Sequence, residues 1–361
     1  QYTDTELQPI IAECKKKADS DQFMYYLYYA SHTLTSYYQN STGGGVDWDG
    51  VCMYDRNITN AEWCVNEALY MAAEGMTILS KSKELNCEVT DEQMDQFEEQ
   101  IESLRESFAS ADDPEKEFED TLRAQGYTED SLKRNGKINA AFTNVFKALY
   151  GENGETLDDE SFNKFIADSG YLKSTHILFL FTKTVEKEDG TTAQETISDD
   201  EKAQKKEQAE ELVAELQAIS DDKERYDRFI ELVNELSEDT GKVRYAEGYV
   251  FTEGTMVQEF TDTTKALKPY EVSGVVESTY GYHIIMGLPI ERTDVETQSQ
   301  TGYSLGYTAA SYALDDEMKS WNINSVAEFN SAYKSFDFTQ FFGDDGFAFT
   351  TFAEYTAAKA E

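Results

Sequence analysis

The sequence of 361 residues predicts an α+β protein, with a mainly helical body built from both ends of the chain and a small domain between them. Up to about Leu172, apolar residues recur at helical spacing between glycine breaks. Residues 173–290 instead alternate short β-branched or aromatic runs with helical segments, in the order strand, helices, strand, helix, strand, strand. That order is typical of helices packed on a four-stranded antiparallel sheet. We therefore expect three regions, 1–172, 173–290 and 291–361.

The N-terminal region is predicted to be helical. A capping box at Thr90 begins one of its helices, and glycines such as Gly126 and Gly151 separate others. The first helix is rich in tyrosine, so it either packs in the core or offers a peptide-binding surface. The expected helices are 23–38, 61–85, 90–108, 115–122 and 139–149.

The C-terminal region is predicted to return to the helical body. A helix is expected over 311–336, and an isolated helix of that length must bury its apolar face, which includes Leu314, Met318 and Trp321. The N-terminal helices offer the larger apolar surface. We therefore expect the middle domain to interrupt one discontinuous helical domain, and the tail from Gly343 to be partly disordered.

The composition of the chain limits the classes of partner that it can bind. The chain has 31 Lys and Arg against 71 Asp and Glu, a formal net charge of −40, which disfavours nucleic acids and anionic membrane surfaces. Basic or unfolded polypeptides fit such a surface better. No run of about 18 apolar residues predicts a membrane span. Because the chain begins at Gln1 without a Met, we expect an exported protein, extracellular or on the cell surface, anchored through a removed N-terminal segment.

The cysteines predict no metal site. Cys14, Cys52, Cys64 and Cys87 form no CxxC pair, so a zinc centre is not expected. Cys52 and Cys64 would close the shortest disulfide loop, and free buried thiols are the alternative. The sequence leaves these two states, and the oligomeric state, open.

The middle domain contains nine predicted segments. A polar loop over 183–192 follows the first strand and carries acidic residues without an arginine cluster, which excludes phosphate-directed specificity. A capping box at Ser198 begins the next helix. The expected segments are the strand 174–181, the loop 183–192, helices 198–216 and 221–236, the strand 248–252, the helix 256–267, and a hairpin with strands 273–278 and 282–288 joined at 279–281.

Four of these segments resemble the parvulin-type (PpiC, rotamase) peptidyl-prolyl isomerases. The flanking helical regions resemble those of PrsA- and SurA-type exported bacterial foldases. The resemblance implies an isomerase that acts on unfolded or proline-containing polypeptides without a cofactor. The segments are Ser174-Thr175-His176-Ile177-Leu178, Gly254-Thr255-Met256-Val257-Gln258-Glu259-Phe260, Val272-Ser273-Gly274-Val275-Val276-Glu277-Ser278 and Tyr280-Gly281-Tyr282-His283-Ile284-Ile285.

The resemblance implies catalytic positions. The chain has three histidines, and His176 and His283 fall at the two family histidine positions, on neighbouring central strands. We expect their ring nitrogens within hydrogen-bond reach, either as part of the active site or as a structural pair. Asp239 aligns with the family's Cys-or-Asp position, where an acceptor would orient the histidines. His32, in the tyrosine-rich helix, is expected to be structural.

The resemblance also implies a proline pocket. Met256 and Phe260 would line it, and their spacing places them on one helix face. Tyr249 stands near the place of an apolar leucine of the family, so it would fill that part of the pocket. Ser278 aligns with the family's threonine and Tyr280 with the next polar position. Core packing is the alternative role for the apolar pair.

The chemistry of such a site breaks no bond. Rotation about a peptide bond has a barrier of about 18–20 kcal/mol, and an apolar pocket lowers it by binding the twisted amide better than the planar forms. Neither a nucleophile nor a metal is needed. Three functions compete: an active isomerase with a chaperone body, a holdase whose isomerase domain has lost turnover, and a cell-surface binding or adhesion protein.

Overall fold

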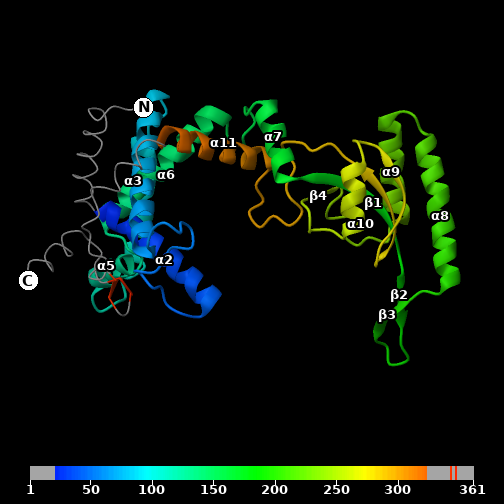
Figure 1. The fold of residues 1–361 in the computed structure, drawn as a ribbon, viewed down its shortest axis with the longest axis horizontal. Coiled ribbons are helices and arrows are strands. Elements are labelled where there is room, and N and C mark those ends of the chain that lie inside the picture. Colours follow the sequence, from blue (N-terminus) through cyan, green and yellow to red (C-terminus); the bar gives the residue numbers. More distant parts are fainter. Residues whose placement is uncertain (1–20, 323–341, 344–345, 348–361) are drawn as a thin grey trace, which may run out of the picture. The chain divides into compact units, whose positions relative to one another are not determined.

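The computed structural model describes residues 21–322, 342–343 and 346–347 (Figure 1). It divides into two compact units. The helical unit comprises residues 1–149 and 313–361, and the sheet unit comprises residues 150–312. None of the helices in the described ranges is long and apolar enough to cross a bilayer.

The helical unit contains helices joined by short turns. Capping boxes begin α3 at Thr59 and α4 at Thr90, because in each the side chain three residues later returns a hydrogen bond to the cap backbone. Asp113 caps α5 from its side chain, with Pro114 at the first turn. The elements are α2 (Asp21–Thr42), α3 (Asn60–Glu84), α4 (Asp91–Glu106), α5 (Pro114–Ala124) and α6 (Glu129–Tyr150).

The packing of α2 against α3 forms the largest part of this core. Leu27 and Leu34 of α2 are fully buried and share a cluster with Cys64 and Ala68 of α3. The tyrosines of α2 are divided between the core and the surface. Tyr26 is only 7% exposed, whereas other tyrosines of the same helix reach the surface.

The three described cysteines of the helical unit are free thiols. Cys52 and Cys64 are both buried as free thiols, and Cys87 is a free, half-buried thiol. Burial raises the pKa of the Cys64 thiol, so this side chain stays protonated. Of the two states left open by the sequence, the structure has the free thiols for these three residues; Cys14 lies outside the described residues.

Helix α6 begins ten residues before its expected start at Asn139. The earlier turns contain Gly136, which predicts a break. In the structure a Cβ at Gly136 would lie 2.4 Å from the ring of Phe97. The glycine is thus kept inside the helix because the α4 side chain packs directly on its backbone.

The sheet unit is built on a four-stranded antiparallel sheet of order β4-β1-β6-β5, which confirms the predicted α+β fold. Ser198 begins α8 with the predicted capping box. The elements are α7 (Asp159–Ser169), β1 (Leu172–Leu180), α8 (Asp199–Ala218), α9 (Asp222–Leu236), β4 (Tyr249–Phe251), α10 (Gln258–Ala266), β5 (Val272–Glu277) and β6 (Gly281–Gly287).

The prediction of a polar loop over 183–192 is wrong. The segment instead forms an exposed hairpin of β2 (Thr182–Glu186) and β3 (Thr192–Thr196), which extends away from the main sheet (Figure 1). Its turn is closed by Gly190 at φ +78° and by Asp189, whose carboxylate accepts the Thr191 N–H. Its apolar residues are one cross-strand pair, Val185 and Ala193, so no apolar alternation marks it as a strand pair.

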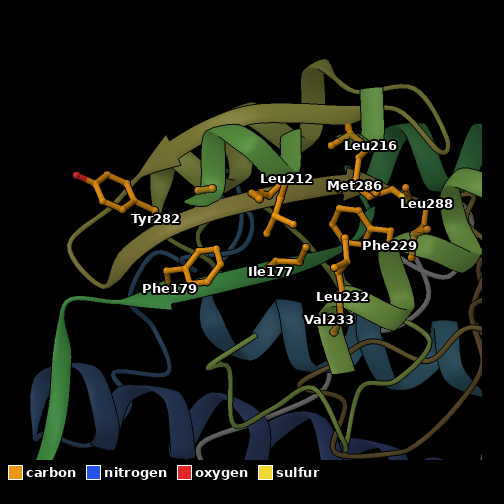
Figure 2. Packing of buried hydrophobic residues seen from close by; sticks show 13 residues of the cluster. Ile177, Phe179, Leu212, Leu216, Phe229, Leu232, Val233, Tyr282, Met286 and Leu288 are labelled. Atoms are coloured by element: carbon orange, nitrogen blue, oxygen red, sulfur yellow. The ribbon is translucent and has the colours of Figure 1, made fainter. Parts of the chain in front are cut away.

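One face of the main sheet packs on α8 and α9. Ile177 of β1 and Ile284 of β6 are fully buried there, beside Leu216 of α8 and Phe229 of α9. Figure 2 shows these helix side chains filling the space above the strands, with Phe229 next to Met286. The period-2 alternation of the strands sends the intervening residues to the opposite face, which α10 covers.

The sheet unit extends beyond the predicted limits of 173–290. The segment after the last strand joins the edge of the sheet, where the Thr297 N–H donates to the Val250 carbonyl and Lys173 forms a buried ion pair with Asp294. Helix α7 joins this segment through an ion pair between Asp159 and Arg292.

Helix α11 (Leu305–Asn322) begins six residues before the expected start at Ser311. Within the sheet unit its Tyr312 ring lies 5.3 Å from that of Phe165, and within the helical unit Lys81 lies over its Trp321 ring. The rest of the expected helix, 323–336, lies outside the described residues. So does the tail from Gly343, apart from the strands β7 (Phe342–Gly343) and β8 (Gly346–Phe347).

Candidate active site: a buried histidine pair under an aromatic lid

The two predicted histidines meet on the α10 face of the sheet. β1 and β6 pair so that His176 lies opposite Ile285 and His283 opposite Leu178, which places both imidazoles on the same face. Their rings stack at 15° with centroids 5.2 Å apart, and the two Nδ1 atoms are 3.0 Å apart. The expected hydrogen-bond reach is therefore confirmed. Both residues are buried.

The hydrogen bonds at this pair run in one direction. A carboxylate only accepts, so His176 donates from Nε2 to Asp239 Oδ2 at 3.1 Å. With neutral rings, His176 Nδ1 then accepts the Nδ1–H of His283. His283 Nε2 accepts the Ser278 hydroxyl at 2.7 Å. The Tyr280 backbone N–H donates to Ser278 Oγ at 3.1 Å and closes the chain. This assignment fixes one tautomer for each imidazole.

The carboxylate at the start of the chain is held ionised. Asp239 lies on the loop after α9, where burial alone would raise its pKa. Hydrogen bonds from His176, the Tyr249 hydroxyl and the Gly241 amide outweigh burial and hold the pKa of this carboxyl well below its usual range. Asp239 thus remains an acceptor at neutral pH, which keeps the proton of His176 on Nε2.

The second imidazole is held neutral. The pKa of His283 is lowered from 6.5 to about 4, mainly by burial and also by the neighbouring His176, while Asp239 raises it by less. A neutral His283 has one ring N–H and one ring acceptor, as the chain of hydrogen bonds requires.

Aromatic and apolar side chains cover the histidines. The Phe260 ring stands edge-on to both, with centroids 5.1 Å from His176 and 5.7 Å from His283. It shares an apolar cluster with Phe251, Ile285 and the half-buried Met256. The structure therefore brings together the two residues expected to line the proline pocket.

Their expected placement on one helix face is wrong. α10 begins at Gln258, so Met256 precedes the helix and only Phe260 lies within it. Val257 occupies the N-cap position without a side-chain hydrogen bond, and the sequence therefore gives no capping signal for this start. Met256 reaches the cluster from the preceding turn.

Tyr249 lies in the apolar cluster with Phe260 and also has a polar role that the sequence did not predict. Its hydroxyl donates to Asp239 Oδ2, and its ring stands edge-on to His176 with centroids 5.6 Å apart. It also lines a small cavity of about 40 Å³ between His176 and α9, which has room for roughly one water. Tyr249 is therefore part of the hydrogen-bond network as well as of the apolar cluster.

Tyr280 lies apart from this cluster. Its side chain is 60% exposed at the turn between β5 and β6, and only its backbone N–H joins the network, through Ser278. The predicted site residues thus divide into a buried group and this one exposed residue.

Two positions that the sequence did not single out support the site. Ser237 Oγ accepts the Leu178 N–H, which ties the loop of Asp239 to β1. Gly241 donates its N–H to Asp239, and a Cβ there would lie 2.2 Å from the Tyr249 hydroxyl. The signal was the short Ser-x-Asp-x-Gly run, whose small residues are typical of a tight side-chain-bonded turn.

The described part of the chain places no three His, Cys, Asp or Glu side chains where they could together hold a metal ion. The arrangement instead places an aromatic and apolar cluster over two buried imidazoles. Such a cluster can bind an uncharged ring and withdraw an amide from water.

Comparisons with known proteins identify the central segment. The family model named Rotamase, the PPIC-type PPIASE domain, matches residues 176–287. The foldase protein PrsA of Clostridium perfringens (strain 13) is 31% identical over 177 residues, 46% of this chain and 44% of that protein. PrsA of Staphylococcus aureus (strain Newman) is 31% identical over 207 residues, 57% of this chain and 55% of that protein. The chain thus covers about half the length of these curated relatives.

Solved structures resemble the chain only loosely. The peptidylprolyl isomerase PrsA of Bacillus cereus is 19% identical and covers 81% of this chain and 93% of its own, with a TM-score of 0.28. A SurA-like chaperone of Campylobacter jejuni is 18% identical and covers 68% of this chain and 86% of its own, with a TM-score of 0.24. At these scores the likeness carries no weight for function.

Proposed function

We propose, from the match of residues 176–287 to the PPIC-type rotamase model, that the chain is a peptidyl-prolyl cis–trans isomerase that assists the folding of exported proteins. The observation that carries the proposal is the buried histidine pair, hydrogen-bonded at both ends and covered by Phe260. Neither the match nor this geometry favours an adhesion function.

The proposed mechanism is selective binding of the twisted amide. The planar peptide bond is stabilised by resonance, and X-Pro bonds isomerise over tens to hundreds of seconds without help. Phe260 and Met256 would hold the pyrrolidine ring on an apolar surface. Water would be excluded there from the carbonyl oxygen, whose resonance with the amide nitrogen is weakened during rotation. The energy of ring binding is thus realised most fully at the twisted geometry.

The polar residues have positioning roles in this proposal. Asp239 fixes the tautomer of His176, His176 fixes that of His283, and Ser278 completes the chain. The hydrogen bonds thus hold both rings in fixed orientations beneath the apolar cluster. Tyr249 holds Asp239 from the other side.

The substrate preference follows from charge. The hairpin of β2 and β3 carries Glu186, Glu188 and Asp189, and the whole chain has a net charge of −40. Like charges at the mouth of a site cost affinity. We propose an apolar or uncharged residue before proline in the preferred substrate, and basic or uncharged unfolded chains as clients. By analogy with its relatives the protein would act outside the cytoplasm, at the cell surface.

A holdase without turnover is the second candidate, and Tyr249 is the observation that favours it. The ring of Tyr249 stands at the place expected for a smaller apolar residue and is 9% exposed, so it narrows the site beside His176. A protein of this kind would suppress the aggregation of an unfolded client while isomerising proline at the uncatalysed rate.

A protease-free assay on proline peptides separates the two candidates. The full chain should accelerate isomerisation, and Phe260→Ala should lower kcat/KM about 100-fold because it removes most of the surface that binds the ring. Phe165→Ala, a truncation of the same size on α7, should change it less than twofold. Aggregation of a reduced client is measured in parallel. If the protein suppresses aggregation but proline isomerises at the uncatalysed rate, the holdase function is supported. If it neither suppresses aggregation nor accelerates isomerisation, the foldase assignment is wrong.

A further inference from the structure

The helical unit holds a pocket that the isomerase site does not use. It has a volume of about 300 Å³ and lies among α2, α3 and α6, three helices that Figure 1 shows within the helical unit. Its floor is close-packed, because a Cβ at Gly75 of α3 would lie 2.8 Å from Ile138 of α6 and 3.4 Å from the Tyr26 hydroxyl. The volume is at the lower end of ligand pockets and matches one large side chain.

Aromatic rings form one wall. Tyr25, Tyr26 and Tyr29 line the pocket from successive turns of α2. Tyr25 is fixed by stacking on Tyr127, with centroids 4.1 Å apart, and it lies 5.4 Å from the Tyr26 ring. Tyr29 is 52% exposed and stands at the rim. Ring faces in such positions attract a cation through their quadrupoles.

The pocket is also lined by a carboxyl group. Glu74 of α3 lines the pocket, and none of the described residues that line it is a Lys or Arg. Burial raises the pKa of Glu74, a hydrogen bond with Tyr70 lowers it, and Asp315 and Glu67 raise it further. A carboxylate surrounded in this way gains from a nearby cation.

One basic side chain of the unit, Lys319 of α11, acts on Glu74 and has other partners. Its effect is the smallest of the effects on the pKa of Glu74, and it forms ion pairs with Asp315 at 2.6 Å and Asp316 at 3.2 Å. Glu74 therefore lines the pocket with Tyr70 as its described hydrogen-bond partner and shares this lysine with two other carboxylates.

We propose that this pocket binds one cationic side chain, an arginine or a lysine, of an unfolded polypeptide. The aromatic wall would stack on the guanidinium or ammonium group, and Glu74 would pair with its charge. Charge complementarity supports this occupant, because the net charge of −40 raises the local concentration of basic segments. The site goes beyond the proposed isomerase function and does not depend on proline.

The test uses a fluorescein-labelled, proline-free peptide of 12 residues made of Gly, Ser and Leu with two arginines, and the same peptide with citrulline in place of arginine. Citrulline keeps the shape and removes the charge. Fluorescence anisotropy with the full chain should give about tenfold tighter binding of the arginine peptide. Glu74→Gln should reduce that preference to about twofold or less.

Matched variants isolate the pocket. Glu99→Gln removes the same charge from an exposed position of α4 and should leave the preference unchanged. Tyr29→Ala should weaken binding of the arginine peptide about threefold, whereas Tyr29→Phe should restore it, since the ring face is kept. Circular dichroism and the proline-peptide assay report whether Glu74→Gln is folded, and Glu74→Asp, which keeps the charge, should retain the preference if it is not.

Three outcomes would overturn the proposal. Equal effects of Glu74→Gln and Glu99→Gln would mean general attraction by the acidic surface. Equal binding of the two peptides would exclude a cation site. More than tenfold tighter binding by a chain without residues 1–20, which include Lys15, Lys16 and Lys17, would assign the pocket to the chain's own lysines. Each outcome is read independently of isomerase turnover, so it leaves the proposed function separately testable.

Discussion

The two faces of the four-stranded sheet are built from alternate residues of the same strands and differ in what they do. On one face, Ile177 and Ile284 pack under α8 and α9 in a dry apolar cluster. On the other, their neighbours His176 and His283 form a hydrogen-bonded pair under Phe260. A single step along a strand therefore separates a residue that stabilises the domain from one that serves the site. Substitutions on the apolar face should therefore lower stability with little loss of activity, whereas substitutions on the histidine face should lower activity.

The largest effect is expected on the apolar face. Phe229 of α9 is fully buried, so Phe229→Ala should lower the free energy of unfolding of the sheet unit by about 3–5 kcal/mol through lost contacts and a cavity. Below the unfolding transition, kcat/KM should change less than threefold. Phe260→Ala should also lower stability, because Phe260 is buried, but it alone should cause a large loss of activity. Equal losses of activity in the two variants would break the comparison.

The measurement can follow the two units separately. All three tryptophans, Trp48, Trp63 and Trp321, lie in the helical unit. Tryptophan fluorescence during urea unfolding thus follows that unit, and hydrogen exchange of the β1 amides follows the sheet unit. Phe229→Ala should weaken only the protection of β1. Phe229→Leu, which keeps most of the volume, should cost about 1 kcal/mol.

The histidine face should make stability depend on pH. The pKa of His283 is lowered from 6.5 in the unfolded chain to about 4 in the folded one, so the unfolded state binds more protons between these values. The stability of the sheet unit should therefore be complete above about pH 6.5 and fall as the pH is lowered towards 4. We expect a loss of about 2 kcal/mol between pH 7.5 and pH 5.

Two carboxyl groups of the helical unit change stability with pH in the opposite sense to His283. Burial raises the pKa of Glu67 and Glu74 in the helical unit, so their contribution is largest at low pH. The effect of His283 is therefore taken as the difference in β1 hydrogen-exchange protection, corrected for intrinsic rates, between the wild type and His283→Gln. A difference that does not vary with pH would show that His283 titrates normally in the folded state.

The next effect concerns the acceptor at the start of the hydrogen-bond chain. Asp239→Asn removes the charge but keeps an oxygen near His176, so kcat/KM should fall about tenfold through a less well fixed tautomer, with KM little changed. Nitrogen-15 NMR of the imidazoles should show mixed tautomers in this variant and a single one in the wild type. Asp200→Asn, on the exposed first turn of α8, is the matched control. An unchanged NMR pattern would reduce Asp239 to a structural residue.

The sequence predicts the histidine face well because its signals are local and dense. His176 lies in a short apolar run and His283 in a hairpin strand, and the resemblance of both segments to the isomerase family implied that these strands are neighbours, as their pairing shows. The hairpin of β2 and β3 could not be predicted in the same way, since each strand has a single apolar residue, Val185 or Ala193, and none of its residues is buried.

Features made by distant segments were beyond prediction. The pocket of the helical unit needs Tyr25, Glu74 and Ile138 from three helices, and no spacing along the chain connects them. Tyr249 was assigned to the proline pocket by its place in the sequence, whereas its hydroxyl is directed to Asp239 by the turn at Gly241. Side-chain direction at such a position depends on the loop that faces it.

The smallest effect is expected at Tyr249 on the histidine face. It decides whether the ring or the hydroxyl of this side chain matters for activity. Tyr249→Phe keeps the ring and removes one of the hydrogen bonds to Asp239, which His176 and the Gly241 amide still hold. Activity should fall about threefold, and the free energy of unfolding by about 1–2 kcal/mol, because an ionised acceptor loses a buried donor. Tyr249→Leu removes the same hydroxyl and also opens space beside His176. If the ring obstructs the substrate, Tyr249→Leu should be more active than both Tyr249→Phe and the wild type in the proline-peptide assay. If the hydroxyl matters only through Asp239, the two variants should be equally impaired and should show the same partial mixing of imidazole tautomers.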